Sequence, residues 1–158
     1  MFEDMACRPV PVSEVVTGST PVVAFGDPRN ASVATLGINP SWHEFLADDG
    51  SLLSGSKRRL ATLTSLNAKD TALLDLDQAR TVFEDCAAYF QPDRNPYRRW
   101  FDPLDQVLRA AFGVSYYART ACHLDLVQWQ LHRSGVNYRD RRKGCGSFYR
   151  SATSGLCY

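Results

Sequence analysis

The fold is indicated most clearly by the segment Ser32-Val33-Ala34-Thr35-Leu36-Gly37-Ile38-Asn39-Pro40-Ser41. Its first seven residues carry no charge and are rich in β-branched and apolar side chains, as in a strand that helices cover on both faces. Pro40 has no N–H for a sheet ladder, so the strand must end before it. We therefore expect a central strand at 33–38, followed by a loop at the sheet edge where open α/β sheets hold their ligands.

Two helices are predicted downstream of this strand. The first follows an N-cap at Asp75 or Asp77 and has one apolar face at helical spacing: Ala79, Val82, Phe83, Cys86, Ala87 and Phe90. The second is predicted to start with Asp102 as N-cap and Pro103 in the first helical position, and to end at Gly113. A shorter helix is expected at 57–66.

Two further strands are predicted, at 22–25 and at 115–127. Because long helical segments separate the strands, parallel pairing is favoured. The expected fold is therefore α/β: a three-layer α/β/α sandwich with a central, mostly parallel sheet.

Composition predicts an ordinary globular protein. Hydrophobic residues make up 44% of the 158 residues and charged residues 22%. No apolar run is long enough to span a membrane, no signal peptide is recognisable, and the five cysteines form no CxxC pair. We expect a cytoplasmic monomer with no bound metal or cofactor and no membrane contact.

The charge is distributed unevenly and suggests two parts. Residues up to Trp129 contain twelve Lys or Arg and sixteen Asp or Glu, whereas residues from Gln130 onward contain six basic residues and one acidic residue. We therefore predict a folded domain at 1–129 and an atypical basic tail at 130–158. Such a tail either follows a phosphate backbone or is simply solvated.

The sequence Gly37-Ile38-Asn39-Pro40-Ser41 after a buried strand resembles the first active-site motif of the uracil-DNA glycosylase superfamily, closest to its mismatch-specific branch. That branch ends the motif in Gly, where this chain has Ser41. The resemblance covers residues 22–129 and implies a base-excision hydrolase that binds a nucleotide flipped out of DNA. It implies that Asn39 positions the attacking water, while Gly37, Ile38, Pro40 and Ser41 line the base site. The family's second motif has no convincing counterpart, since His132-Arg133-Ser134 lacks its proline.

Other candidate site residues follow from the same resemblance. Phe45 is a candidate for stacking on the base, and His123 or Asp125 for reading its edge. Lys57, Arg58 and Arg59 are candidates for contacts with DNA phosphates. Each also has a structural interpretation: core packing for Phe45, a hydrogen-bonded pair at a sheet end for His123 and Asp125, and a solvated segment for the three basic residues.

Three functions remain open at this point. The first is a DNA glycosylase that hydrolyses the N-glycosidic bond of uracil or another damaged base, in single- or double-stranded DNA. The second is a domain of the same fold that binds a nucleobase or nucleic acid without catalysis. The third is an unrelated doubly wound domain in which 37–41 is only a strand-ending turn.

Overall fold

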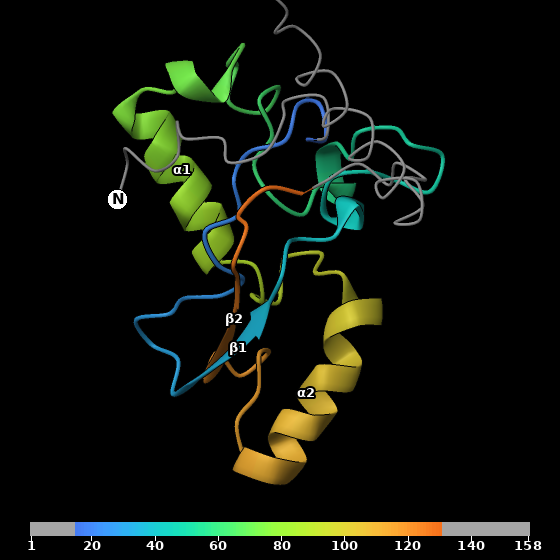
Figure 1. Cartoon of the computed structure of the whole chain (residues 1–158), viewed down its shortest axis with the longest axis vertical. Coiled ribbons are helices and arrows are strands. Elements are labelled where there is room, and N and C mark those ends of the chain that lie inside the picture. The colour runs from blue at the N-terminus through green and yellow to red at the C-terminus, as the bar shows by residue number, and fades with distance from the viewer. Residues whose placement is uncertain (1–14, 131–158) are drawn as a thin grey trace, which may run out of the picture.

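The computed structural model describes residues 15–130 of the chain. The predicted tail therefore lies, apart from Gln130, outside the described residues. Within them the protein is a mixed α/β domain with two strands, β1 (Val33–Gly37) and β2 (Ala121–Asp125), and two α-helices, α1 (Leu76–Ala87) and α2 (Arg98–Phe112). Short 3-10 helices occupy Trp42–Glu44, Gly55–Lys57 and Thr71–Leu73, so the predicted α-helix at 57–66 is not formed. Figure 1 shows the strands in the middle of the view, with α1 on one side and α2 on the other.

Strands β1 and β2 pair in parallel, as predicted, with Thr35 opposite His123 and Gly37 opposite Asp125. The segment 22–25 runs antiparallel along the other edge of β2, where Phe25 and His123 exchange backbone hydrogen bonds of 2.8 and 3.0 Å. Among the described residues, β2 thus has a neighbour on each edge and β1 on only one. The expectation that β1 is the central strand is wrong for this part of the chain.

The expectation that β1 is buried on both faces is also wrong. Its side chains alternate between partly buried and exposed, and Leu36 is 67% exposed. Alternation arises because successive side chains of a strand point to opposite faces. An uncharged, β-branched run does not reveal that one of its faces lacks a cover.

Helix α1 begins after Asp75, which is one of the two predicted N-caps. Asp75 accepts a hydrogen bond from the backbone N–H of Gln78, and the Gln78 side chain accepts one from the N–H of Asp75. This reciprocal capping box satisfies two N–H groups that the first turn leaves unpaired. Ala79, Val82 and Cys86 on the predicted apolar face are buried.

Helix α2 begins one turn earlier than predicted, at Arg98 rather than after Asp102, and it contains Pro103. The additional turn is anchored by Phe101, which is fully buried, and Asp102 instead accepts a hydrogen bond from the Tyr117 hydroxyl. Gly113 ends the helix with a φ of 66°, the left-handed conformation that glycine adopts without strain. The predicted end of the helix is confirmed.

Aromatic rings fill the core between the sheet and the helices. Phe90 packs edge-to-face on Tyr89 and Phe101 at centroid distances of 5.0 and 4.9 Å, and Phe25 lies 4.8 Å from Tyr89. Edge-to-face pairs add about 0.5–1.5 kcal/mol each beyond the area they bury. The cluster fixes α1 and α2 relative to β2, which carries His123 and Asp125.

Candidate functional site

A cavity of about 440 Å³ opens at the carboxyl ends of the two parallel strands. Its volume falls within the range of small-molecule sites, and its position matches the usual ligand edge of a parallel sheet. The loop after β1, the end of β2, the first 3-10 helix and the start of α2 all contribute to its wall. The lining residues are Phe25, Leu36, Gly37, Ile38, Asn39, Pro40, Ser41, Glu44, Trp100, Phe101, His123 and Asp125.

Gly37 has a steric role in this site. A Cβ atom built on it would lie 2.3 Å from Oδ1 of Asp125 and 2.8 Å from Nε2 of His123. Contacts this short do not occur in folded proteins, so the two β2 side chains can cross over β1 only because residue 37 is glycine. The space beside Gly37 is thus used by side chains of the protein itself.

Hydrogen bonds through Thr35 and a contact with Asp125 orient His123. The Thr35 hydroxyl lies 2.6 Å from the Tyr116 hydroxyl and 2.7 Å from Nδ1 of His123, and Nε2 of His123 lies 3.5 Å from Oδ1 of Asp125. If Tyr116 donates to Thr35 and Thr35 to Nδ1, the ring proton resides on Nε2 and faces the carboxylate. The opposite tautomer would direct a lone pair at a negative charge, so the first arrangement is favoured.

The carboxylate of Asp125 is buried next to the cavity. Its side chain is only 3% exposed, and its second oxygen, Oδ2, is buried without a hydrogen-bond partner among the described residues. A buried carboxylate oxygen without a partner costs about 1–3 kcal/mol or more, because it has lost its hydration. Because Oδ2 has almost no accessible surface, a molecule in the cavity does not reach it in this arrangement.

Glu44 is a site residue that the sequence did not reveal. It is 2% exposed, and its Oε2 accepts a hydrogen bond of 2.5 Å from Tyr89, whose hydroxyl in turn accepts one of 2.8 Å from the backbone N–H of Tyr97. Burial raises the pKa of Glu44 to about 7, outweighing the Tyr89 hydrogen bond and the positive charge of Arg59, and the negative charge of Asp125 raises it further. The cavity therefore has a second carboxyl group that exchanges its proton near neutral pH.

The motif loop lies at the mouth of the cavity. Asn39 is exposed, and its side-chain Nδ2 donates a hydrogen bond of 2.9 Å to the carbonyl of Pro40, which leaves the amide oxygen for other contacts. The Ser41 hydroxyl accepts from the N–H of His43 and caps the 3-10 helix Trp42–Glu44. This short helix places Glu44 in the cavity wall, three residues after the motif.

The aromatic rings that line the cavity do not include Phe45, the ring predicted from the sequence. Phe45 is 1% exposed in the hydrophobic core and does not line the cavity, so the structure places it in a packing role. Trp100 and Phe101, at the start of α2, line the cavity instead, and Trp100 is 53% exposed. Trp100 is thus the ring available for stacking on a ligand.

The three predicted DNA contacts differ in their surroundings. Lys57 is exposed, whereas Arg58 lies 3.8 Å from the buried carboxylate of Asp85, and Arg59 lies over the ring of Tyr97 at 5.1 Å. Arg58 and Arg59 therefore already have partners within the protein. DNA binding by this group stays a prediction.

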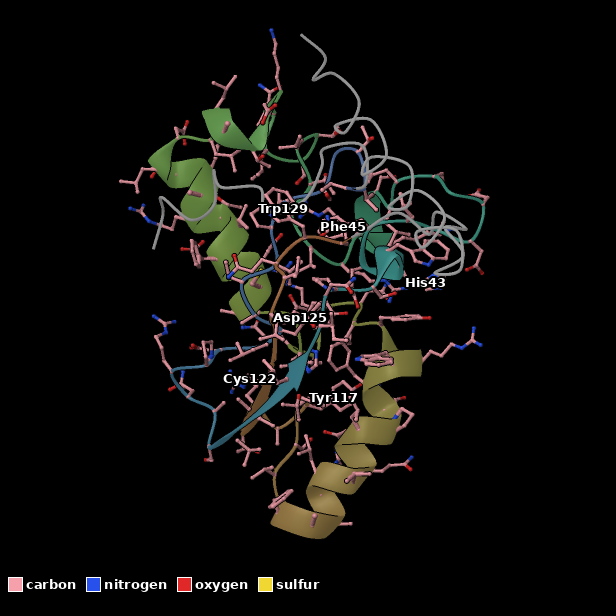
Figure 2. All side chains as sticks on the ribbon, viewed as in Figure 1. His43, Phe45, Tyr117, Cys122, Asp125 and Trp129 are labelled. Atoms are coloured by element: carbon pink, nitrogen blue, oxygen red, sulfur yellow. The ribbon has the colours of Figure 1, made fainter. Side chains whose placement is uncertain are left out.

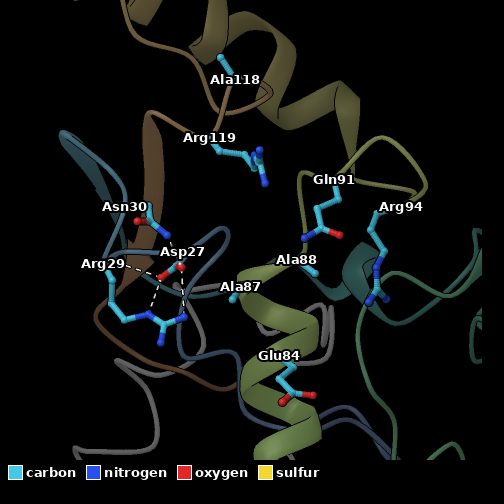
Figure 3. Close-up of a pocket in the computed structure, with 10 residues that line it drawn as sticks. All are labelled: Asp27, Arg29, Asn30, Glu84, Ala87, Ala88, Gln91, Arg94, Ala118 and Arg119. Atoms are coloured by element: carbon cyan, nitrogen blue, oxygen red, sulfur yellow. Dashed lines mark hydrogen bonds and ion pairs between the residues drawn. The ribbon is translucent and has the colours of Figure 1, made fainter.

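A second hollow, of about 560 Å³, lies near the amino ends of the strands (Figure 3). Arg119 points into it, while Arg29 is held by two hydrogen bonds to Asp27 and Arg94 by an ion pair of 2.9 Å with Asp85. Basic and acidic side chains alternate in its wall without forming a common centre. Figure 2 shows Asp125 well separated from Cys122, which lies towards this other end of β2.

Residues 15–130 contain neither a metal-binding group of side chains nor a helix that could span a membrane. No group of three or more His, Cys, Asp and Glu side chains in this range is arranged to hold a metal ion. None of its helices combines the length and apolar character that crossing a membrane requires. The cysteines at 86 and 122 are buried free thiols, and burial raises the pKa of Cys86 to about 11, so that thiol is unreactive at neutral pH.

The chain was also compared with known proteins. No protein-family model, no curated protein and no solved structure matches it.

Proposed function

We propose that the protein is a DNA glycosylase-like hydrolase that removes a base from DNA, built on a three-layer α/β/α sandwich like that of the uracil-DNA glycosylase superfamily. One observation carries the proposal. The loop 37–41 and the β2 residues His123 and Asp125, which are 82 or more residues apart in sequence, line one cavity of about 440 Å³. The resemblance of 37–41 to the family motif rests on sequence alone, and a strand-ending turn with no ligand needs no such cavity.

The chemistry follows from the positions of the side chains. A base extruded from DNA enters the cavity, stacks on Trp100 and meets His123 and Asp125 at the inner wall. Asn39, at the mouth, lies where the sugar and the attacking water arrive. Its amide has no useful basicity, so it orients the water through Oδ1, and the enzyme accelerates cleavage by positioning and electrostatics.

The hydrogen bond from Asn39 to Pro40 supports a second candidate function, a domain that binds a base without cleaving it. It occupies one of the two N–H groups of the amide and so restricts how Asn39 can hold a water. In either case we place the protein in the cytoplasm as a monomer, with DNA as its partner and no cofactor.

A glycosylase assay separates these functions. Oligonucleotides that contain uracil, cytosine or a damaged purine are incubated with the protein, and abasic sites are counted after alkaline cleavage. We expect Asn39→Ala to lower cleavage by at least about 10²-fold, as for other single catalytic groups. Asn30→Ala, which changes an amide near the other hollow, should leave cleavage intact.

Three results would argue against the proposed hydrolase or against the role of Asn39 in it. Binding of these oligonucleotides without cleavage would favour the non-catalytic domain. Cleavage that Asn39→Ala reduces only slightly would move Asn39 to a structural role. Failure to bind DNA or a free base would favour the unrelated fold in which 37–41 is only a turn.

A further inference from the structure

Large apolar side chains are exposed at the carboxyl ends of the two strands. Leu36 of β1 is 67% exposed, Ile38 directly after β1 is 74% exposed, and Leu126 directly after β2 is 71% exposed. The N–H groups of Leu126 and Val127 donate to the carbonyls of Gly37 and Ile38, so these exposed residues are neighbours in space. We call Leu36, Ile38 and Leu126 the open face. A contiguous apolar surface of this kind marks a contact with another segment or molecule.

The outer edge of β1, on the side away from β2, is also open. Among residues 15–130 the sheet contains only β1 and β2, so no described strand lies along this edge. The carbonyl of Gly37 accepts a hydrogen bond from Leu126 and therefore points towards β2. Because the backbone groups of successive residues point to alternate edges, those of Ala34 and Leu36 point outward. Such an edge is a template for pairing with another strand.

The chain itself has a segment that is long enough to reach this edge. Residues 131–158 follow Gln130, which comes five residues after the end of β2. A strand that pairs with all of β1 needs about five residues, or roughly 17 Å, whereas 28 extended residues span up to about 90 Å. A segment that returns from the carboxyl end of β2 along β1 would run antiparallel to it. The apolar side chains available in this segment include Leu131, Val136, Tyr138, Phe148, Tyr149 and Leu156.

Charge and tethering favour this segment over a second copy of the chain. Residues 131–158 contain six basic residues and one acidic residue, whereas residues 15–130 contain eleven basic and thirteen acidic residues. The two parts therefore have net charges of opposite sign and attract each other, while two copies of 15–130 repel. A tethered segment is also present at an effective concentration in the millimolar range, without the entropy cost of bringing two molecules together.

We propose that part of residues 131–158 pairs with the outer edge of β1 as an antiparallel strand and covers the open face. Leu36 and Ile38 also line the cavity at the carboxyl ends of the strands, so the added segment lies beside that cavity. Its backbone pairs with Ala34 and Leu36, and its apolar side chains remove the open face from water. This proposal does not depend on what the cavity binds.

Hydrogen exchange followed by NMR on the full chain tests the proposal. We expect the N–H groups of Ala34 and Leu36, and a run of consecutive N–H groups within 131–158, to exchange at least about 10-fold more slowly than in an unstructured chain. Free exchange throughout 131–158 would overturn the proposal. Protection that is lost when the protein is diluted would also overturn it, because the partner would then be a second molecule.

Two matched variants test which surface the segment covers. Leu36→Lys places a charge on the open face, opposite a basic segment, so it should speed exchange at Ala34 and within 131–158 by at least about 10-fold. Leu73→Lys is the control, because Leu73 is an apolar residue of similar exposure, 73%, in the 3-10 helix Thr71–Leu73. It should leave both sets of rates unchanged. Unchanged rates in Leu36→Lys, or equal changes in the two variants, would overturn the proposal.

Discussion

Substitution of Gly37 by alanine tests the geometry of the site most simply. The new methyl group would approach Oδ1 of Asp125 to 2.3 Å and Nε2 of His123 to 2.8 Å. His123 has little room to retreat, because its ring packs against Phe25 and Phe101 at centroid distances of 5.8 and 5.7 Å. Asp125 must therefore turn away and lose its contact with His123.

The expected change in stability follows from two opposing effects. Inserting a methyl group into a packed site costs about 1–3 kcal/mol. Removing a glycine from a strand gains roughly 0.5–1 kcal/mol, because the unfolded chain loses conformational freedom. We expect Gly37→Ala to lower the free energy of unfolding by about 1–2 kcal/mol, measured by urea denaturation followed by circular dichroism, and to abolish binding of the base.

The control for this experiment is Ala34→Ser, at an exposed position of the same strand, which should change stability by less than about 0.5 kcal/mol. A Gly37→Ala protein as stable as wild type, with ligand binding intact, would refute the reasoning. It would mean that His123 and Asp125 do not cross over β1.

Three further predictions concern polar side chains that are buried or partly buried. Thr35→Val should lower the free energy of unfolding by about 1–3 kcal/mol, because Tyr116 and His123 lose their shared hydrogen-bond partner. ¹⁵N NMR should also show a smaller population of the Nε2–H tautomer of His123. An unchanged tautomer ratio would contradict the hydrogen bonds assigned to Thr35. Because the folded-state pKa of Glu44, about 7, exceeds its ordinary value of 4.5, the folded state binds the extra proton, and the stability this gives is complete below pH 4.5 and lost as the pH rises through 7. The difference in unfolding free energy between wild type and Glu44→Gln should therefore fall by up to about 3 kcal/mol over that pH range. A difference that does not change with pH would mean that the Glu44 carboxyl group is solvated. Asp105→Ala should lower the free energy of unfolding by about 3 kcal/mol, because the buried Asp105 carboxylate accepts a hydrogen bond of 2.8 Å from the backbone N–H of Tyr116. A thermal unfolding midpoint within a degree of wild type would argue against this stabilising role of Asp105.

Local signals in the sequence predicted what local interactions determine. The cap of α1 and the end of α2 at Gly113 depend on residues within one turn. The structure has Asp75, the first of the two predicted caps, and confirms Gly113. The start of α2 was wrong, because burial of Phe101 against rings distant in sequence extends the helix past the cap signal at Asp102. A cap motif states where a helix can start, whereas packing decides where it does.

In the candidate site, too, local features were predictable from the sequence and features set by distant packing were not. The edge position of 37–41 follows from the strand and the proline, and the alternation of a strand correctly places His123 and Asp125 on one face. Glu44 and Trp100 were missed because their inward or outward direction depends on a one-turn 3-10 helix and on the early start of α2. The spacing from Asn39 to Glu44 was visible, but an isolated acidic residue in a loop is usually solvated, and nothing local indicated its burial.

The proposed function depends on one claim, that the cavity at the carboxyl ends of the strands holds a base. An NMR titration of the ¹⁵N-labelled full chain with free uracil, cytosine and adenine in turn tests this claim directly. We expect at least one base to cause saturable shifts of the backbone amides of Gly37, Asn39 and Asp125, with no shift at Arg29 and Arg119 around the other hollow. Shifts confined to Arg29 and Arg119, or no shifts with any of the bases at millimolar concentration, would contradict the claim.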